Sequence, residues 1–191
     1  MALIDLASRQ IYGKIVYFGP GLGGKTTNLR EIHARLPISA QSDLVSIDSE
    51  GERTVFFDFL PLDLGTVHGF SIRFQLYTVP GQPHYERTRA AVLGGADGVV
   101  FVADSRVTAQ PENRQSLDEL GRALARQGKS IDTFPLVIQY NKADVLDAAT
   151  MPDLESNLNP TGRISMSAVA IQGIGVFETL KAICKLVVQQ L

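Results

Sequence analysis

The sequence contains no tryptophan and a single cysteine, Cys184. One cysteine cannot form an internal disulfide, so we expect a cytoplasmic protein stabilised by its core alone. There is no N-terminal signal sequence and no apolar run of the roughly 18 residues that a membrane-spanning helix needs. Residue 2 is Ala, and residues 187–191 do not form a prenylation signal. We therefore expect no direct membrane anchor.

An excess of charge of one sign is also missing. The formal net charge is -2, the sequence pI is about 5.9, and no block of Lys or Arg occurs. This excludes the basic footprint of proteins that bind nucleic acid or anionic membranes. The 191 residues, 45% of them hydrophobic, suit one domain with a continuous core. We expect this domain to span residues 1–191 and to be monomeric by itself, with proteins or small molecules as partners.

Apolar runs rich in β-branched and aromatic residues predict strands at 11–18, 55–60, 70–79, 98–103 and 134–140, with a shorter one near Ile164. Helical spacing of apolar residues predicts helices at 26–36, 112–127 and 176–191. Alternating strands and helices predict a three-layer α/β fold with a mixed, mostly parallel sheet of about six strands.

One connection departs from this alternation. Residues 61–69 are too few to hold a crossover helix, so the second and third runs are predicted to form an antiparallel edge hairpin. Residues 2–9 are predicted to add a short strand that pairs back on residues 11–18.

The strongest motif is G-x-x-x-x-G-K-[ST] at residues 19–26, between an expected strand and an expected helix. We call this segment the P-loop. Its glycines let backbone N–H groups point at phosphate, Lys25 is expected at the β- and γ-phosphates, and the Thr26 hydroxyl at Mg²⁺. A glycine-rich turn that only starts a helix is the alternative. The predicted nucleotide contacts here are Gly19, Gly21, Leu22, Gly23, Gly24, Lys25, Thr26 and Thr27.

A second motif, N-K-x-D at residues 141–144, follows the strand expected at 134–140. Ligands of open α/β folds bind at this carboxyl end of the sheet. The Asp144 carboxylate can accept the N1–H and 2-amino donors of guanine, which adenine does not offer, and the Lys142 stem can cover the base. Asn141, Lys142 and Asp144 are therefore predicted to bind guanine, although the string alone could be a surface turn.

A third base contact is predicted after the last short strand, at Ser167, Ala168 and Val169. The backbone N–H of Ala168 could reach the guanine O6. The segment could equally be a plain strand end, and the residues leave the two interpretations open.

Residues 38–53 form a polar segment that we expect to be mobile. Thr54, directly after it, could give Mg²⁺ a second hydroxyl and hold the segment while the γ-phosphate is present. The alternative role of Thr54 is to start a strand. Arg53 would point away from the phosphates in an extended chain, so we hypothesise an arginine finger in cis that enters after rearrangement. A solvated loop arginine is the alternative.

The segment after the third expected strand supplies the hydrolysis residues. The Gly81 N–H can approach the γ-phosphate because no Cβ intervenes, and Gln82 would orient the attacking water. Pro83 suits a first helical position, so a helix is predicted to begin immediately beyond Gln82. Without the P-loop, the same stretch would be an ordinary polar turn.

With these residues in place, the chain resembles the MglA family, bacterial Ras-like GTPases of cell polarity and gliding motility. The strings that carry the resemblance span most of the chain, at residues 15–22, 25–29, 53–62, 76–82, 98–105 and 175–181. The resemblance implies that Arg53 and Gln82 are the catalytic pair. It also implies a GTPase-activating Roadblock-type dimer resembling MglB that lends no arginine, polarity or motility effectors, and a second strand that shifts register between nucleotide states.

Two departures from the wider Ras pattern stand out, and a third feature departs from the MglA pattern itself. Thr78 replaces the Asp of D-x-x-G, so Mg²⁺ lacks its usual carboxylate, and Asp58 is predicted to substitute for it through water. Val169 replaces the terminal Lys of the third base motif. Pro83 and residues 87–89 are unusual within the MglA pattern.

The predicted function is a GTP-hydrolysing switch with slow unaided turnover. Two alternatives remain, a P-loop phosphotransferase such as a nucleotide kinase and a GTP-binding interaction module with little hydrolysis.

Overall fold

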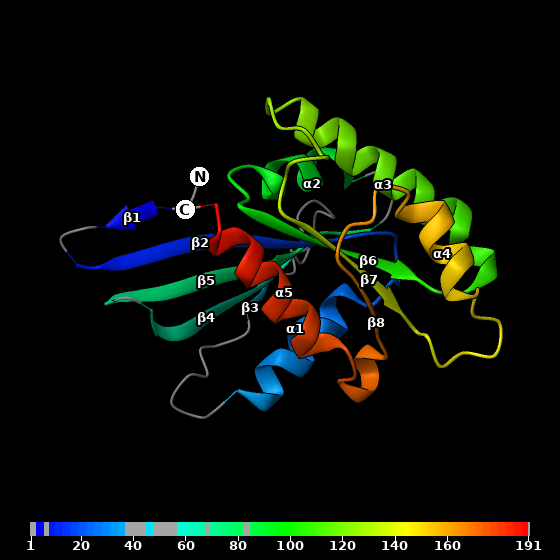
Figure 1. The fold of residues 1–191 in the computed structure, drawn as a ribbon, viewed down its shortest axis with the longest axis horizontal. Coiled ribbons are helices and arrows are strands. Elements are labelled where there is room, and N and C mark those ends of the chain that lie inside the picture. The colour runs from blue at the N-terminus through cyan, green and yellow to red at the C-terminus, as the bar shows by residue number, and fades with distance from the viewer. Residues whose placement is uncertain are drawn as a thin grey trace.

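The computed structural model describes residues 3–5, 8–36, 45–47, 57–67, 69–81 and 85–190. A mixed β-sheet forms the middle of three layers, with helices on both of its faces (Figure 1). Its strands are β1 (Leu3–Asp5), β2 (Gln10–Phe18), β3 (Val45–Ile47), β4 (Phe57–Val67), β5 (Phe70–Thr78), β6 (Gly98–Asp104), β7 (Leu136–Asn141) and β8 (Ser165–Ser167). This architecture confirms the predicted three-layer α/β fold.

The strand order is β3-β4-β5-β2-β6-β7-β8, and β1 pairs with β2. Strands β5, β2, β6, β7 and β8 are parallel, whereas β3, β4 and β5 pair antiparallel. The mostly parallel sheet and its antiparallel edge hairpin are thus confirmed. The short strand predicted within residues 2–9 is also confirmed, because β1 pairs Leu3 with Tyr12 and Asp5 with Gln10.

Two strands differ from the sequence prediction. Strand β3 lies inside the polar segment that we interpreted as a loop, so the described residues hold eight strands rather than about six. Strand β4 runs on through Pro61 to Val67 instead of ending at Leu60. Strand β3 pairs with residues 57–59 of β4, whereas Pro61 lies beyond these pairs and is paired with Gln75 of β5.

The helices are α1 (Lys25–Arg35), α2 (Glu86–Leu93), α3 (Gln110–Ala125), α4 (Met151–Leu158) and α5 (Val176–Val188), with 3₁₀ turns η3 (Val107–Ala109) and η4 (Ala170–Gln172). Helix α2 begins at Glu86, and the start predicted immediately beyond Gln82 falls on residues outside the described ones. Helix α4 was not predicted, since it is short and buries only Leu154 and Leu158. Its start carries a recognisable signal, because the Thr150 hydroxyl accepts from Asp153 N at 3.3 Å.

Alternation along the strands divides the core between the two faces of the sheet. Ile15 and Tyr17 of β2 pack with α1 and α5, whereas Val16 and Phe18 pack with α2, α3 and α4. Figure 1 shows the same division, with α1 and α5 on one side of the sheet and the other three helices opposite. Among the described residues, we find no helix with the length and apolar character needed to cross a membrane.

The parallel strands end together at one edge of the sheet. Thr78 pairs with Tyr17 near the end of β2, and Asp104 pairs with Asn141 at the ends of β6 and β7. The segments that follow these strands therefore meet in one region, which holds most of the residues predicted to bind nucleotide.

Candidate nucleotide site

The P-loop connects β2 to α1 along a cavity of about 1090 Å³. Gly24 is the N-cap of α1, with φ of 102°, and no side chain caps the helix there. A Cβ on Gly24 would also collide with the Asn141 amide. Both the positive φ and this close contact therefore require glycine at this position. With no cap and no acidic residue in its first turn, the N-terminus of α1 is suited to an anion.

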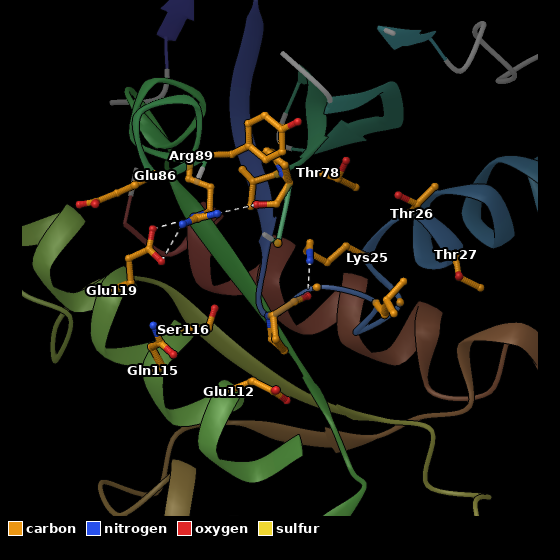
Figure 2. Close-up of a pocket in the computed structure, with 18 of the residues that line it drawn as sticks. Lys25, Thr26, Thr27, Thr78, Glu86, Arg89, Glu112, Gln115, Ser116 and Glu119 are labelled. Carbon is orange, nitrogen blue, oxygen red and sulfur yellow. Dashed lines mark hydrogen bonds and ion pairs between the residues drawn. The ribbon is translucent and has the colours of Figure 1, made fainter. Parts of the chain in front are cut away.

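Lys25 lies almost completely buried beneath the P-loop. Its Nζ donates to Gly19 O at 2.9 Å and to Pro20 O at 2.6 Å. Burial, and secondarily the positive charge of Arg89, lowers the pKa of Lys25 to about 7. Thr26 and Thr27 line the same cavity (Figure 2). If a phosphate bound here, Lys25 could donate to its charged oxygens instead of to the two backbone carbonyls.

The segment after β5 reaches the P-loop, as the sequence prediction requires. Thr78, which replaces the Asp of D-x-x-G, is buried at the end of β5 and lines the cavity. A Cβ on Gly81 would collide with the backbone of Gly21 and lie 2.5 Å from Pro20 C. Gly81 and the P-loop are therefore in backbone contact, and only glycine permits that approach.

Asn141, which we predicted to bind guanine, links two segments of the site. It is 3% exposed, its Nδ2 donates to Gly23 O at 2.8 Å, and its Oδ1 accepts from Ala170 N at 2.9 Å. Both polar ends are thus used to hold the P-loop and η4 together. Asp144 is exposed in the turn that follows.

Lys142 is tied to the end of β6. It adopts a positive φ of 64°, and its Nζ lies 2.6 Å from Asp104 Oδ2. Asp104 also accepts from Arg106 N at 3.1 Å and from the Arg106 guanidinium at 2.6 Å. Burial alone would raise the pKa of Asp104, but the hydrogen bonds from Arg106 and Lys142 outweigh it and hold the pKa below its usual value. The carboxylate is therefore ionised and fixes the Lys142 side chain.

The contacts of residues 167–169, predicted as a third base contact, favour the alternative that they form a plain strand end. Ala168 N donates to Tyr140 O at 2.8 Å, and Ala143 N donates to Ala168 O at 3.1 Å. Val169 N donates to Ile174 O at 3.0 Å. The Ala168 amide that we predicted to reach guanine O6 therefore continues the pairing of β7 and β8. Ser167 lies exposed at the end of β8.

Several predicted site residues lie outside the described residues, namely Arg53, Thr54, Gln82 and Pro83. Asp58 is described as part of β4, where it pairs with Ser46. The neighbouring pair is Phe59 with Tyr77, so continuation of this register brings Asp58 opposite Thr78.

Sequence reasoning missed a buried polar network behind the P-loop. Asn28 Nδ2 donates to Gln139 Oε1 at 2.8 Å and to Gly24 O at 3.0 Å. Gln139 Nε2 in turn donates to Asn28 Oδ1 at 2.9 Å and to Thr179 Oγ1 at 3.0 Å. The network joins α1, β7 and α5, and no short motif in the sequence signals it.

A P-loop after the central strand β2, a glycine segment after β5 that meets it, and N-K-x-D after β7 together define a small Ras-like GTPase. The chain is 49% identical over 191 residues to the mutual gliding-motility protein MglA of Myxococcus xanthus (strain DK1622), covering 100% of this chain and 98% of that protein. It therefore belongs to the MglA family.

A more distant similarity points to the same class. The chain is 28% identical over 116 residues to ADP-ribosylation factor-like protein 6 of Caenorhabditis briggsae, covering 58% of this chain and 60% of that protein. A scan against protein-family models finds no match.

Proposed function

We propose that the chain is a molecular switch that binds GTP with Mg²⁺ and changes conformation when the γ-phosphate is hydrolysed. The observation that carries the proposal is the backbone contact between Gly81 and the P-loop beside the cavity that Lys25 and Thr26 line. A terminal phosphate in this cavity would touch both segments, so its loss would release one from the other.

Among the described residues, Thr26 supports a magnesium site. Thr26 lines the cavity next to Lys25, and a hydroxyl is the hard oxygen donor that Mg²⁺ prefers. We propose Thr26 and Thr54 as its protein ligands, with Asp58 acting through water because its register position faces Thr78. When bound, the ion neutralises charge on the β- and γ-phosphates.

The proposed reaction is the in-line attack of water on the γ-phosphorus, with catalysis by position and charge. Lys25 and the P-loop amides hold the phosphates, and the Gly81 N–H approaches the γ-phosphate. Gln82 orients the water. Arg53 stabilises the transition state only after its segment has rearranged, so GTP should stay bound to the pure protein for minutes or longer.

For the base, we propose that Asp144 accepts the two guanine donors and that Lys142 covers the ring. The ion pair between Lys142 and Asp104 supports this, because it fixes the lysine next to the turn that carries Asp144. Asn141 acts indirectly in this scheme, by holding Gly23.

The biological role is proposed from the similarity to MglA of Myxococcus xanthus. Because the chain is 49% identical to a mutual gliding-motility protein over its full length, we propose a role in motility or cell polarity. Its activator would be a Roadblock-type dimer resembling MglB that repositions Arg53, and its effectors would recognise the GTP form, which could bring the switch to a cell pole.

Single-turnover hydrolysis of GTP, with and without the Roadblock-type dimer, tests this proposal. We expect the protein to hydrolyse GTP slowly by itself and faster with the dimer. In Arg53→Ala, the rate of hydrolysis with the dimer should fall by roughly a thousandfold. Gln82→Leu should retain GTP and lose hydrolysis with and without the dimer. Full stimulation of Arg53→Ala would contradict the arginine finger, and recovery of intact GTP from stimulated wild type would contradict the switch.

A further inference from the structure

Arg89 of α2 lines the cavity, where it contacts both α3 and the segment after β5. Its Nε lies 2.6 Å from Glu119 Oε1 and its Nη2 lies 2.9 Å from Glu119 Oε2, so α3 holds the guanidinium through both oxygens. Its Nη1 donates to Pro80 O at 3.0 Å. Figure 2 shows Arg89 pointing from α2 toward Glu119, with dashed lines that mark the contacts between the two side chains.

The burial of this ion pair indicates that it positions a neighbouring segment rather than stabilising the fold. The side chains of Arg89 and Glu119 are 3% and 17% exposed, and a pair that has lost this much hydration adds little net stability. A second ion pair between the same helices, from Arg126 to Glu86, is 63% and 53% exposed. Unlike this exposed pair, the buried pair also reaches the segment after β5, through the bond from Arg89 to Pro80 O.

The atom that Arg89 holds is next to the residue that meets the P-loop. Pro80 O belongs to the peptide bond whose nitrogen is that of Gly81, so fixing this carbonyl also fixes the direction of the Gly81 N–H. Gly81 in turn lies against Pro20 and Gly21. A planar fork with its charge already paired suits this task, because it donates to Pro80 O without needing to move.

We propose that Arg89 is a positioning residue for the γ-phosphate: held by Glu119, it fixes the Pro80–Gly81 peptide so that the Gly81 N–H meets GTP. The proposal rests on the proposed function, in which Gly81 contacts the terminal phosphate. GDP lacks that phosphate, so Arg89 should influence the retention of GTP and leave that of GDP nearly unchanged.

The test measures dissociation of fluorescent GTP and GDP analogues from the full chain. In Arg89→Met, the GTP analogue should leave about tenfold faster, the effect of losing one charge-assisted hydrogen bond, while GDP analogue release changes less than about twofold. The double variant Arg89→Met/Glu119→Gln, which leaves no unpaired carboxylate, should behave in the same way. Arg89→Lys should also lose GTP selectively, since its single ammonium cannot replace the fork.

Arg126→Met is the matched control, because it removes the exposed pair with Glu86 of α2, and Arg126 itself does not line the cavity. It should retain both analogues like wild type. Equal acceleration of both analogues in the Arg89 variants, or full retention of GTP in Arg89→Lys, would overturn the positioning role. If wild type itself retains no GTP analogue, the proposed function fails as well. If wild type retains it and Arg89→Met matches Arg126→Met, this inference alone fails.

Discussion

At the scale of single residues, the P-loop is held in shape by side chains that reach its carbonyl groups. Lys25 donates to Gly19 O and Pro20 O from below, and Asn141 donates to Gly23 O from the end of β7. The glycine-rich string and its lysine could be predicted from the sequence because their spacing is itself the motif. The contact from Asn141 could not, since an amide side chain is equally able to bind a base or a backbone, and the fold decides between them.

Lys25 makes the binding of GTP depend on pH. Its pKa is about 7 in this structure, whereas phosphate charge would raise that pKa, so at higher pH binding must take up a proton. The affinity for GTP should therefore fall as the pH rises above 7, by up to about tenfold per pH unit. Isothermal titration calorimetry near pH 8, in buffers of different ionisation enthalpy, measures the uptake directly. Lys25→Arg, which stays charged, should show no such uptake, and an unchanged wild-type affinity across this range would contradict the prediction.

Loss of Asn141 should loosen the P-loop. Asn141→Ala leaves Gly23 O and Ala170 N without their buried partner, so we expect a loss of about 3 kcal/mol in the free energy of unfolding. Urea denaturation without nucleotide measures it. Asn157→Ala, which removes a partly buried bond of 3.2 Å to Gln110, should cost less than about 1 kcal/mol. Equal effects of the two variants would show that the contact to Gly23 is unimportant.

At the scale of elements, the long periodic segments could be predicted and the short ones could not. Strands β2, β5, β6 and β7 and helices α1, α3 and α5 follow from apolar runs or a clear helical stripe. Strand β3 has three residues in a polar stretch, and its pairing with β4 is a tertiary contact that no local pattern encodes. The site depends on the elements that could be predicted, because the P-loop joins β2 to α1.

The buried network of Asn28, Gln139 and Thr179 should make α1, β7 and α5 cooperative. Gln139→Ala removes three buried hydrogen bonds, leaves Asn28 Oδ1 without the donor that it has here, and opens a cavity. We therefore expect a loss of about 3 kcal/mol in the free energy of unfolding, measured by urea denaturation. Gln127→Ala, at an exposed position after α3, should stay within about 0.5 kcal/mol of wild type. A Gln139→Ala variant as stable as Gln127→Ala would exclude any structural role for the network.

At the scale of the whole molecule, the sheet brings distant segments to one edge and so assembles the site. The ends of β2, β5, β6 and β7 carry the P-loop, Gly81, Asp104 and the N-K-x-D segment. Helices cover both faces of the sheet (Figure 1), and the edge where these strands end is the place where ligands of such folds bind. The fold class could be predicted from the alternation of elements, whereas the meeting of Gly81 with Gly21 depends on strand order, which sequence spacing alone does not define.

The central claim is that this edge binds guanine nucleotides, and a comparison of guanine, adenine and xanthine nucleotides tests it most directly. Equilibrium titration of purified wild type should give a preference of about a thousandfold or more for GDP over ADP, because a site built to pair two base donors rejects a base that lacks them. Asp144→Asn, whose amide can donate to the 2-oxo group of xanthine, should weaken GDP binding and gain xanthosine diphosphate binding. Equal affinity of wild type for GDP and ADP would contradict the account.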